Sequence, residues 1–137
     1  MKVIGIAFSD LHLGEYSKFN EDNKRTLNHI RVLYLIKDLC IKYKCPAFFC
    51  GDFMHRPEFI STSLDEIIIE QFEELNRYEE FNIYGISGNH CMPKANTIEH
   101  RSPSHWANLC RRYSFLHNID FSYHDFGKFR VVGIPYI

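Results

Sequence analysis

Three polar clusters in this 137-residue sequence carry side chains that bind divalent metal ions. Asp10 and His12 form the first cluster, Asp52 the second, and Asn89 with His90 the third. Carboxylate, imidazole and amide oxygen together suit a borderline-hard ion such as Mn²⁺, Fe²⁺ or Zn²⁺ better than a thiophilic one. Each cluster taken alone is more often a turn or a helix cap than a ligand. The chemistry therefore depends on whether the fold brings the three clusters together.

Each cluster directly follows an apolar segment that is predicted to be a strand, at 2–8, 47–50 and 82–87. The first segment is almost continuously apolar, which is typical of a strand covered on both faces. In a parallel α/β sheet the carboxyl ends of the strands share one edge, where such folds bind ligands. Gly51 and Gly88 precede the second and third clusters and let the backbone turn tightly there. We therefore expect the three clusters to converge on one ion-binding site.

Helices are predicted between these strands. Residues 20–22 supply N-cap candidates for a long amphipathic helix that ends before Cys45-Pro46. A capping box, Ser63-x-x-Glu66, predicts the start of a second helix with one apolar face. Residues 102–104 open a shorter third helix through Cys110, with proline tolerated in its first turn.

Three further short strands are predicted at 114–117, 121–125 and 128–134. Strands and helices alternate through the first three strands, and this order predicts an α/β fold. The expected architecture is a mostly parallel sheet with flanking helices and right-handed crossovers. No repeat or linker interrupts the sequence, so one domain is expected.

The composition is that of an ordinary globular protein. Its 45% apolar and 24% charged residues exclude a disordered or fibrous chain. The net charge of −1 provides no global field for nucleic acid or anionic membranes, so any polyanion contact must be local. The apolar start is too short for a signal peptide or a membrane span. The five cysteines lack the spacing of a zinc site and are predicted to be free thiols. We expect a cytoplasmic protein with no membrane partner. The composition suggests the codon bias of an AT-rich genome, such as many phages have, and a phage protein would lie in the host cytoplasm.

The three clusters and their flanking residues resemble, in order and spacing, the first three motifs of the calcineurin-like metallophosphoesterases: Ser9-Asp-Leu-His-Leu-Gly14, Gly51-Asp-Phe-Met-His-Arg56 and Ser87-Gly-Asn-His90. The histidine in Gly-Asp-x-x-His and the closing Ile-Pro-Tyr are most similar to the branch of SbcD-type DNA repair exonucleases and phage recombination endonuclease subunits. The resemblance covers essentially the whole chain. It implies that residues 1–137 are the amino-terminal part of a single metallophosphoesterase domain, an αββα sandwich.

The resemblance implies a metal-dependent phosphodiester hydrolase, a DNA exonuclease or endonuclease subunit of recombination or repair. Two divalent ions are implied, with Mn²⁺ first and Fe²⁺, Zn²⁺ or Mg²⁺ as alternatives. By position, Asp10 and His12 bind the first ion, Asp52 bridges both ions, and Asn89 binds the second. Metal-bound hydroxide is then the nucleophile of an in-line displacement. His90 is implied to stabilise the transition state or to protonate the leaving alcohol.

His55 matches a position where the nuclease branch keeps a histidine near the substrate phosphate, although a surface loop beside Pro57 explains it equally well. The implied partners are DNA and an SbcC-like ATPase subunit, and a homodimer is a further option. A mild excess of positive charge between residues 94 and 130 supports contact with a phosphate backbone. The pair Arg111-Arg112 within it equally suits a helix carboxyl terminus.

Two departures from the family pattern keep alternatives open. The family's later histidine motif and its Gly-His-x-His are missing, and Cys91 stands where an acidic residue usually follows the histidine. We therefore expect weak metal binding and poor hydrolysis from this chain alone. One alternative is a phosphomonoesterase or phosphatase, although phosphoprotein phosphatases usually carry Gly-Asp-x-x-Asp-Arg-Gly and Gly-Asn-His-Glu. The other is a shortened, catalytically incapable scaffold, or a half that another chain completes.

Overall fold

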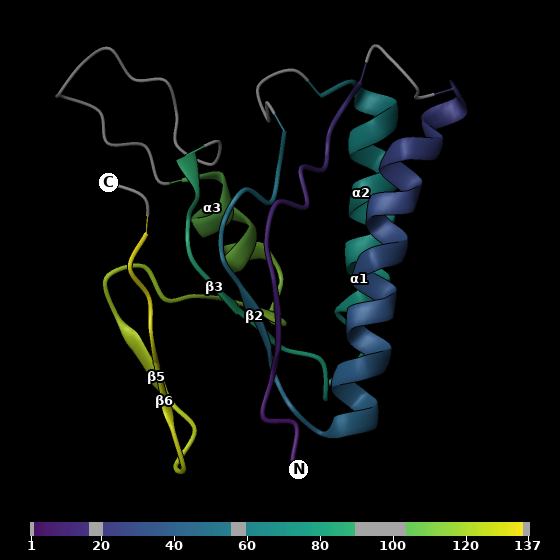
Figure 1. Cartoon of the computed structure of the whole chain (residues 1–137). Coiled ribbons are helices and arrows are strands. Elements are labelled where there is room, and N and C mark those ends of the chain that lie inside the picture. The colour runs from purple at the N-terminus through teal and green to yellow at the C-terminus, as the bar shows by residue number, and fades with distance from the viewer. Residues whose placement is uncertain (1, 17–20, 56–59, 90–103, 136–137) are drawn as a thin grey trace, which may run out of the picture.

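The computed structural model describes residues 2–16, 21–55, 60–89 and 104–135 (Figure 1). Its centre is a sheet of four short parallel strands: β1 (Ile6–Phe8), β2 (Ala47–Phe49), β3 (Ile83–Gly85) and β4 (Leu116–Asn118). The strands are hydrogen-bonded in their sequence order, β1-β2-β3-β4. Helices connect them: α1 (Lys24–Tyr43), α2 (Thr62–Leu75) and α3 (His105–Arg112). The predicted α/β class, with a parallel sheet and flanking helices, is confirmed.

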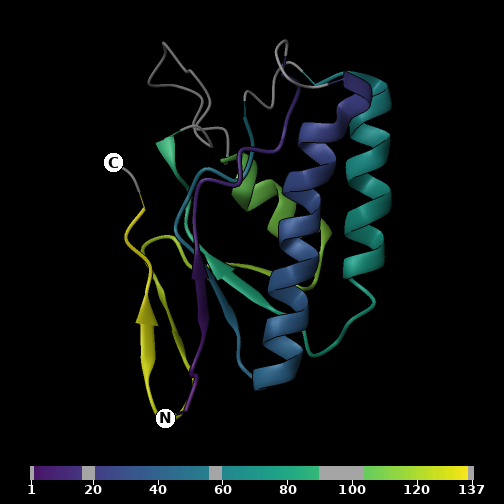
Figure 2. The same cartoon turned by 45° about the vertical axis from the view of Figure 1, so that its right-hand side comes forward.

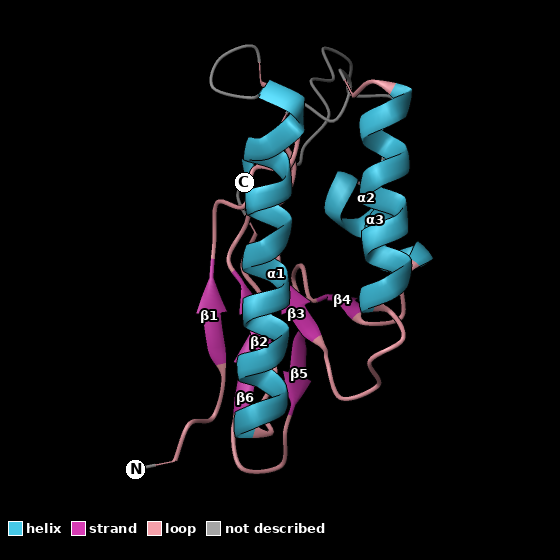
Figure 3. Cartoon of the chain, turned by 90° about the vertical axis from the view of Figure 1, so that its right-hand side faces the viewer, coloured by secondary structure: helices cyan, strands magenta, loops and turns pink. Residues whose placement is uncertain are grey.

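The helices lie on one face of the sheet, and an antiparallel hairpin lies on the other (Figure 2, Figure 3). The hairpin consists of β5 (Tyr123–Asp125) and β6 (Arg130–Val132). Parallel strands in sequence order, joined by crossovers of one hand, place every connecting helix on the same face. The result is three layers: helices, parallel sheet and hairpin.

The core lies between the sheet and the helices and is rich in aromatic rings. Phe49 of β2 packs on Trp106 of α3, with ring centres 4.9 Å apart, and on Phe53, with ring centres 5.0 Å apart. Phe53 in turn contacts Phe72 of α2. The buried indole N–H of Trp106 donates to the carbonyl of Gly85 at 3.0 Å, and a side chain at Gly85 would collide with the indole. Aromatic packing therefore fixes α2 and α3 against β2 and β3.

The hairpin covers the other face through a second aromatic cluster. Tyr84 of β3 stacks on His117 of β4, with ring centres 4.4 Å apart, and contacts His124 of β5 at 4.3 Å. Phe126, in the turn of the hairpin, contacts both Tyr84 and Phe48 of β2. These residues come from three strands and the hairpin, so the cluster joins the two sheets.

The strands are shorter than predicted, and the expected coverage of the first one is wrong. β1 begins at Ile6, whereas Ile4 is 57% exposed. It is an edge strand: Ile6 and Phe8 pack against the core while Ala7 is exposed. The apolar run predicted burial on both faces because local composition cannot show that a strand is at the edge of its sheet.

The helix starts also differ from those predicted. Ser61, not Ser63, caps α2, because the helix begins at Thr62 and the Ser61 hydroxyl accepts from the Leu64 N–H at 3.4 Å. α1 follows a short 3₁₀ helix, η1 (Glu21–Asn23), and its N-cap Asn23 has left-handed backbone angles and no side-chain cap. α3 begins at His105, and its first turn contains no proline, contrary to the prediction. Among the described residues, no helix is both long and apolar enough to cross a membrane.

The cysteines of the described segments, Cys40, Cys45, Cys50 and Cys110, are free thiols, as predicted. Burial is the main cause that raises the pKa of Cys40 to about 12, and that of Cys110 to about 12 as well. Both thiols are therefore protonated and poorly nucleophilic at neutral pH. Cys91 lies outside the described residues.

We predict that the aromatic cluster makes stability depend on pH through His117. Burial, and secondarily the neighbouring His124, lower the pKa of His117 below its usual 6.5. Above that value the imidazole is neutral in both states, whereas below it the unfolded chain binds a proton that the folded chain does not. The free energy of unfolding should therefore fall as pH drops below about 6.5. Urea denaturation at pH 7.5 and 5.5 should show a smaller fall for His117→Phe, which keeps the stacking; an equal fall would contradict the prediction.

Candidate metal centre

The loops that follow β1 and β2 run side by side beyond the carboxyl edge of the sheet. Their backbones are joined by hydrogen bonds from Asp10 N–H to the Gly51 carbonyl at 3.0 Å and from His12 N–H to the Asp52 carbonyl at 3.0 Å. Further bonds run from Leu13 N–H to the Phe53 carbonyl and from His55 N–H to the Leu13 carbonyl. The first two predicted clusters therefore lie on paired backbone.

Three residues of these loops have left-handed backbone angles: Asp10 (φ 54°), His12 (φ 47°) and Asp52 (φ 62°). Such angles cost a residue with a side chain about 1–2 kcal/mol each. They persist only where the surrounding structure holds them, and they are concentrated at functional sites. Here the paired backbone and the buried side chains of Leu13 and Phe53 hold the loops in place.

The same three residues bring their side chains together. One potential ligand atom from each of Asp10, His12 and Asp52 lies within 4.8 Å of the other two. His12 Nε2 is 3.5 Å from Asp10 Oδ1, and the Ser9 hydroxyl donates to Asp10 Oδ2 at 2.5 Å. Asp10 is exposed, while His12 and Asp52 are half-buried, so an ion could enter from solvent. Two carboxylates and one imidazole at this spacing fit a single divalent ion such as Mn²⁺.

The third cluster approaches through its glycine. A Cβ at Gly88 would collide with the side chain and the backbone nitrogen of Asp52, and a Cβ at Gly51 would lie 3.0 Å from the Cα of Gly88. Only glycines let the loops after β2 and β3 meet this closely. Asp10, His12 and Asp52 are called the metal cluster below. The contact at Gly88 brings the backbone just before Asn89, an exposed residue, to this cluster. His90, the predicted catalytic residue, lies outside the described residues.

A buried polar network holds the end of β3. The backbone N–H and the hydroxyl of Ser87 donate to the two carboxylate oxygens of Asp120, at 2.8 and 2.6 Å. The Ser87 hydroxyl also lies 2.5 Å from that of Ser104, the N-cap of α3. The loop that carries Asn89 is therefore tied to α3 and to the segment after β4. Neither Asp120 nor Ser104 was predicted to support the site.

A pocket of about 340 Å³ opens beside the metal cluster. It is lined by Asp10, His12, Tyr16, Arg25, His29 and His55. The structure thus places the predicted His55 at the site, where its ring lies edge-on to His12 with centres 5.8 Å apart. Tyr16, Arg25 and His29 were missed. The one available signal was the four-residue spacing of Arg25 and His29, which puts them on the same face of a helix.

The start of α1 is fastened to the first loop. The fully buried Thr26 hydroxyl donates to the Gly14 carbonyl at 2.7 Å, and the Tyr16 hydroxyl donates to the His12 carbonyl. The Arg25 guanidinium lies 3.7 Å from the centre of the Tyr16 ring, a cation–π contact. The ring of Tyr16 also stacks on His55, with centres 5.0 Å apart. Tyr16 therefore links α1 to both metal-cluster loops.

His29 forms another wall of the pocket. Burial is the main cause that lowers the pKa of His29, and the cationic Arg25 lowers it further, although a hydrogen bond to the backbone of His12 opposes them. The imidazole is therefore neutral at pH 7. Burial likewise raises the pKa of Tyr16, so its hydroxyl keeps its proton.

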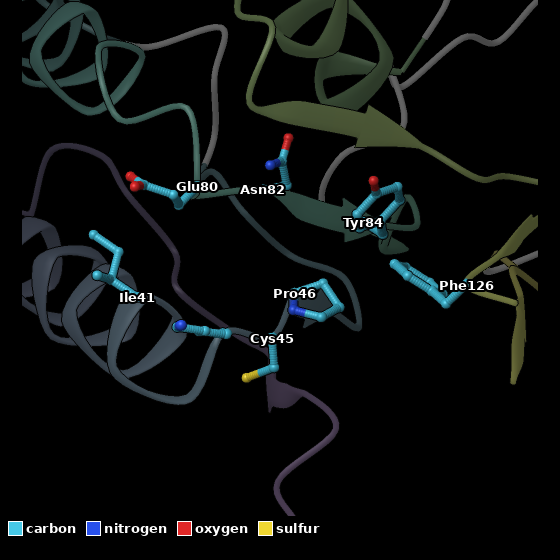
Figure 4. Close-up of a pocket in the computed structure, with 8 residues that line it drawn as sticks. Ile41, Cys45, Pro46, Glu80, Asn82, Tyr84 and Phe126 are labelled. Atoms are coloured by element: carbon cyan, nitrogen blue, oxygen red, sulfur yellow. The ribbon is translucent and has the colours of Figure 1, made fainter. Parts of the chain in front are cut away.

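Another hollow, of about 490 Å³, lies at the amino ends of β2 and β3 (Figure 4). Its lining is Ile41, Lys44, Cys45, Pro46, Glu80, Asn82, Tyr84 and Phe126. Ligands of parallel α/β sheets bind at the carboxyl ends of the strands. The position of this hollow, at the opposite edge, favours the smaller pocket as the functional site.

Comparison with known proteins gives no family assignment: no protein-family model matches the sequence, and no curated protein matches it. The function is therefore inferred from the residues and the geometry of the site.

We predict that the cluster binds Mn²⁺ through its carboxylates. Asp52→Asn removes a charged ligand and should raise the Kd for Mn²⁺ at least about tenfold, which is about 1.4 kcal/mol. Isothermal titration calorimetry on the folded chain measures the change. Glu70→Gln, at an exposed acidic position on α2, is the matched control and should leave the affinity unchanged. Equal affinities for Asp52→Asn and the unmodified chain would contradict the assignment.

We also predict that Gly88 is required for the geometry of Asp52. The methyl group of Gly88→Ala meets Asp52, so the variant should lose about 1–3 kcal/mol of unfolding free energy and bind Mn²⁺ more weakly. Gly127→Ala is the control, because Gly127 has φ 79° but open space around it. It should cost about 1–2 kcal/mol and leave Mn²⁺ binding unchanged. Urea denaturation and calorimetry on both variants separate backbone strain from displacement of the ligand.

Proposed function

We propose that the chain is the amino-terminal, metal-binding part of a metallophosphoesterase domain that hydrolyses phosphodiesters in DNA. The observation that carries this proposal is the convergence of Asp10, His12 and Asp52 within 4.8 Å at the carboxyl edge of a parallel sheet. The first two of the three motifs that resemble this family supply these residues in the matching order, and the third supplies Asn89 and His90. The role proposed for the protein is that of a nuclease subunit in recombination or repair.

The layers of the fold are consistent with the proposed αββα sandwich. Helices cover one face of the parallel sheet, and the β5–β6 hairpin packs on the other face, where a second sheet of a sandwich belongs. Residues 1–137 would then form a helix layer, a first sheet and the start of the second sheet.

The proposed cofactor is a pair of divalent ions, with Mn²⁺ first. Asp10, His12 and Asp52 would hold one ion, and Asp52 with Asn89 would hold the other. When bound, such ions polarise phosphoryl oxygens and lower the pKa of water so that it becomes a nucleophile at neutral pH. The carboxylates offset the charge of the ions, and the paired loops keep the ligands in place before substrate arrives.

The substrate phosphate is proposed to lie in the pocket beside the cluster. His55 lines this pocket next to His12, so its imidazole can donate a hydrogen bond to a phosphate oxygen. Protonation of the leaving alcohol is assigned to His90 on the sequence resemblance. DNA and an SbcC-like ATPase remain the proposed partners, and the cytoplasm the proposed compartment.

We predict slow, Mn²⁺-dependent cleavage of DNA and of bis(p-nitrophenyl) phosphate by the purified chain. Asp52→Asn should lower the rate about 100-fold or more, since it removes the ligand shared by both proposed ions. Glu70→Gln should keep the rate of the unmodified chain. EDTA should abolish the reaction, and excess Mn²⁺ should restore it. Absence of Mn²⁺-dependent cleavage, or cleavage unaffected by Asp52→Asn, would overturn the proposal.

The same assay separates the alternative enzyme class. A phosphomonoesterase would hydrolyse p-nitrophenyl phosphate faster than the diester, because its site is built for a terminal phosphate. A diesterase should show the reverse preference at equal substrate concentration.

A further inference from the structure

The pocket beside the metal cluster is lined by chemically different groups. Asp10 and His12 belong to the metal cluster, and Tyr16, Arg25, His29 and His55 complete the lining. Asp10 is the one acidic residue among the described residues that line the pocket, and Arg25 carries a permanent positive charge. Arg25 therefore offers an anion a positively charged partner within this pocket.

Arg25 is positioned by neighbouring groups. It lies in the first turn of α1, which the buried Thr26 hydroxyl fastens to the Gly14 carbonyl. Its guanidinium lies over the Tyr16 ring, and Tyr16 is itself held by its hydrogen bond to the His12 carbonyl and by stacking on His55. A guanidinium over a ring keeps its N–H donors in its own plane, so it can bind a phosphate with two parallel hydrogen bonds. The orientation needed for phosphate binding is thus supplied before the ligand arrives.

His55 connects the metal cluster to Tyr16. Its ring is edge-on to His12, a residue of the metal cluster, and stacked on Tyr16, whose ring lies under the Arg25 guanidinium. The pocket volume of about 340 Å³ is at the small end of the range for ligand pockets. A pocket of this size cannot enclose an oligonucleotide, so further nucleotides must extend into solvent.

We propose that Arg25, held over Tyr16, is a subsite for a second phosphate of the substrate, adjacent to the phosphate at the metal cluster. This inference rests on the proposed function and specifies its substrate: a nucleic-acid strand that presents successive phosphates. A substrate with one phosphate reaches the metal cluster alone.

The test measures binding of a fluorescein-labelled hexathymidylate to the chain in EDTA, where no metal-dependent cleavage occurs. Fluorescence anisotropy at several salt concentrations gives the slope of log K against log salt. Each phosphate contact with a single strand contributes about 0.7 to that slope. Arg25→Gln should therefore reduce the slope by about 0.7 and weaken binding several-fold at low salt. Arg25→Lys keeps the charge and should retain the slope while binding more weakly than arginine.

Arg31→Gln is the matched control. Arg31 is an exposed arginine of the same helix, hydrogen-bonded to Asn28, and it does not line the pocket. Its loss should leave the slope unchanged. An unchanged slope in Arg25→Gln, an equal decrease in Arg31→Gln, or no binding of the probe by the unmodified chain would overturn the proposal. Far-ultraviolet circular dichroism verifies that each variant is folded.

A second measurement distinguishes failure of this subsite from failure of the proposed reaction. With Mn²⁺, Arg25→Gln should raise KM for the hexathymidylate more than KM for bis(p-nitrophenyl) phosphate, since the small diester has one phosphate. If the salt slope falls but the unmodified chain cleaves nothing, the subsite stands and the reaction does not. If cleavage is normal but neither the slope nor the KM ratio changes, the reaction stands and the subsite does not.

Discussion

The pairing of the loops after β1 and β2 is the constraint on which the site depends. Four backbone hydrogen bonds continue the contact between the two chain segments beyond the last strand residues. The paired backbone carries Asp10, His12 and Asp52 with left-handed angles that are unfavourable for residues with side chains. Burial of Leu13 and Phe53 on the same segments opposes this strain, because exposing either side chain would lose apolar burial. Ligand geometry and core packing are therefore parts of one interaction.

Two aromatic clusters hold the three layers of the fold together, one on each face of the parallel sheet. Trp106 and Phe49 hold α3 against the strands on the helix side, and Tyr84 and His117 receive the hairpin on the other side. The Ser87–Asp120–Ser104 network then holds the loop after β3, since its buried polar atoms satisfy one another. Stability and site geometry are thus coupled through the same strand ends.

Charge in this protein is organised locally. A net charge of −1 leaves no general attraction for polyanions, yet one pocket is lined by both Asp10 of the metal cluster and Arg25. In the proposed function the carboxylates would face the metal and the guanidinium a phosphate, so one pocket needs groups of both charges. Tyr16 connects them, because its ring contacts the Arg25 guanidinium and its hydroxyl donates to the His12 carbonyl.

The sequence alone determined the α/β class and the convergence of Asp10, His12 and Asp52, because apolar runs predict strands and parallel strands end at one edge. It did not determine that β1 is an edge strand or that Ser61 caps α2, since strand neighbours and helix starts depend on contacts distant in sequence. Only the tertiary structure showed that α1 turns Arg25 and His29 toward the loop carrying Tyr16. Helical spacing shows which residues share a face, but packing decides what that face meets.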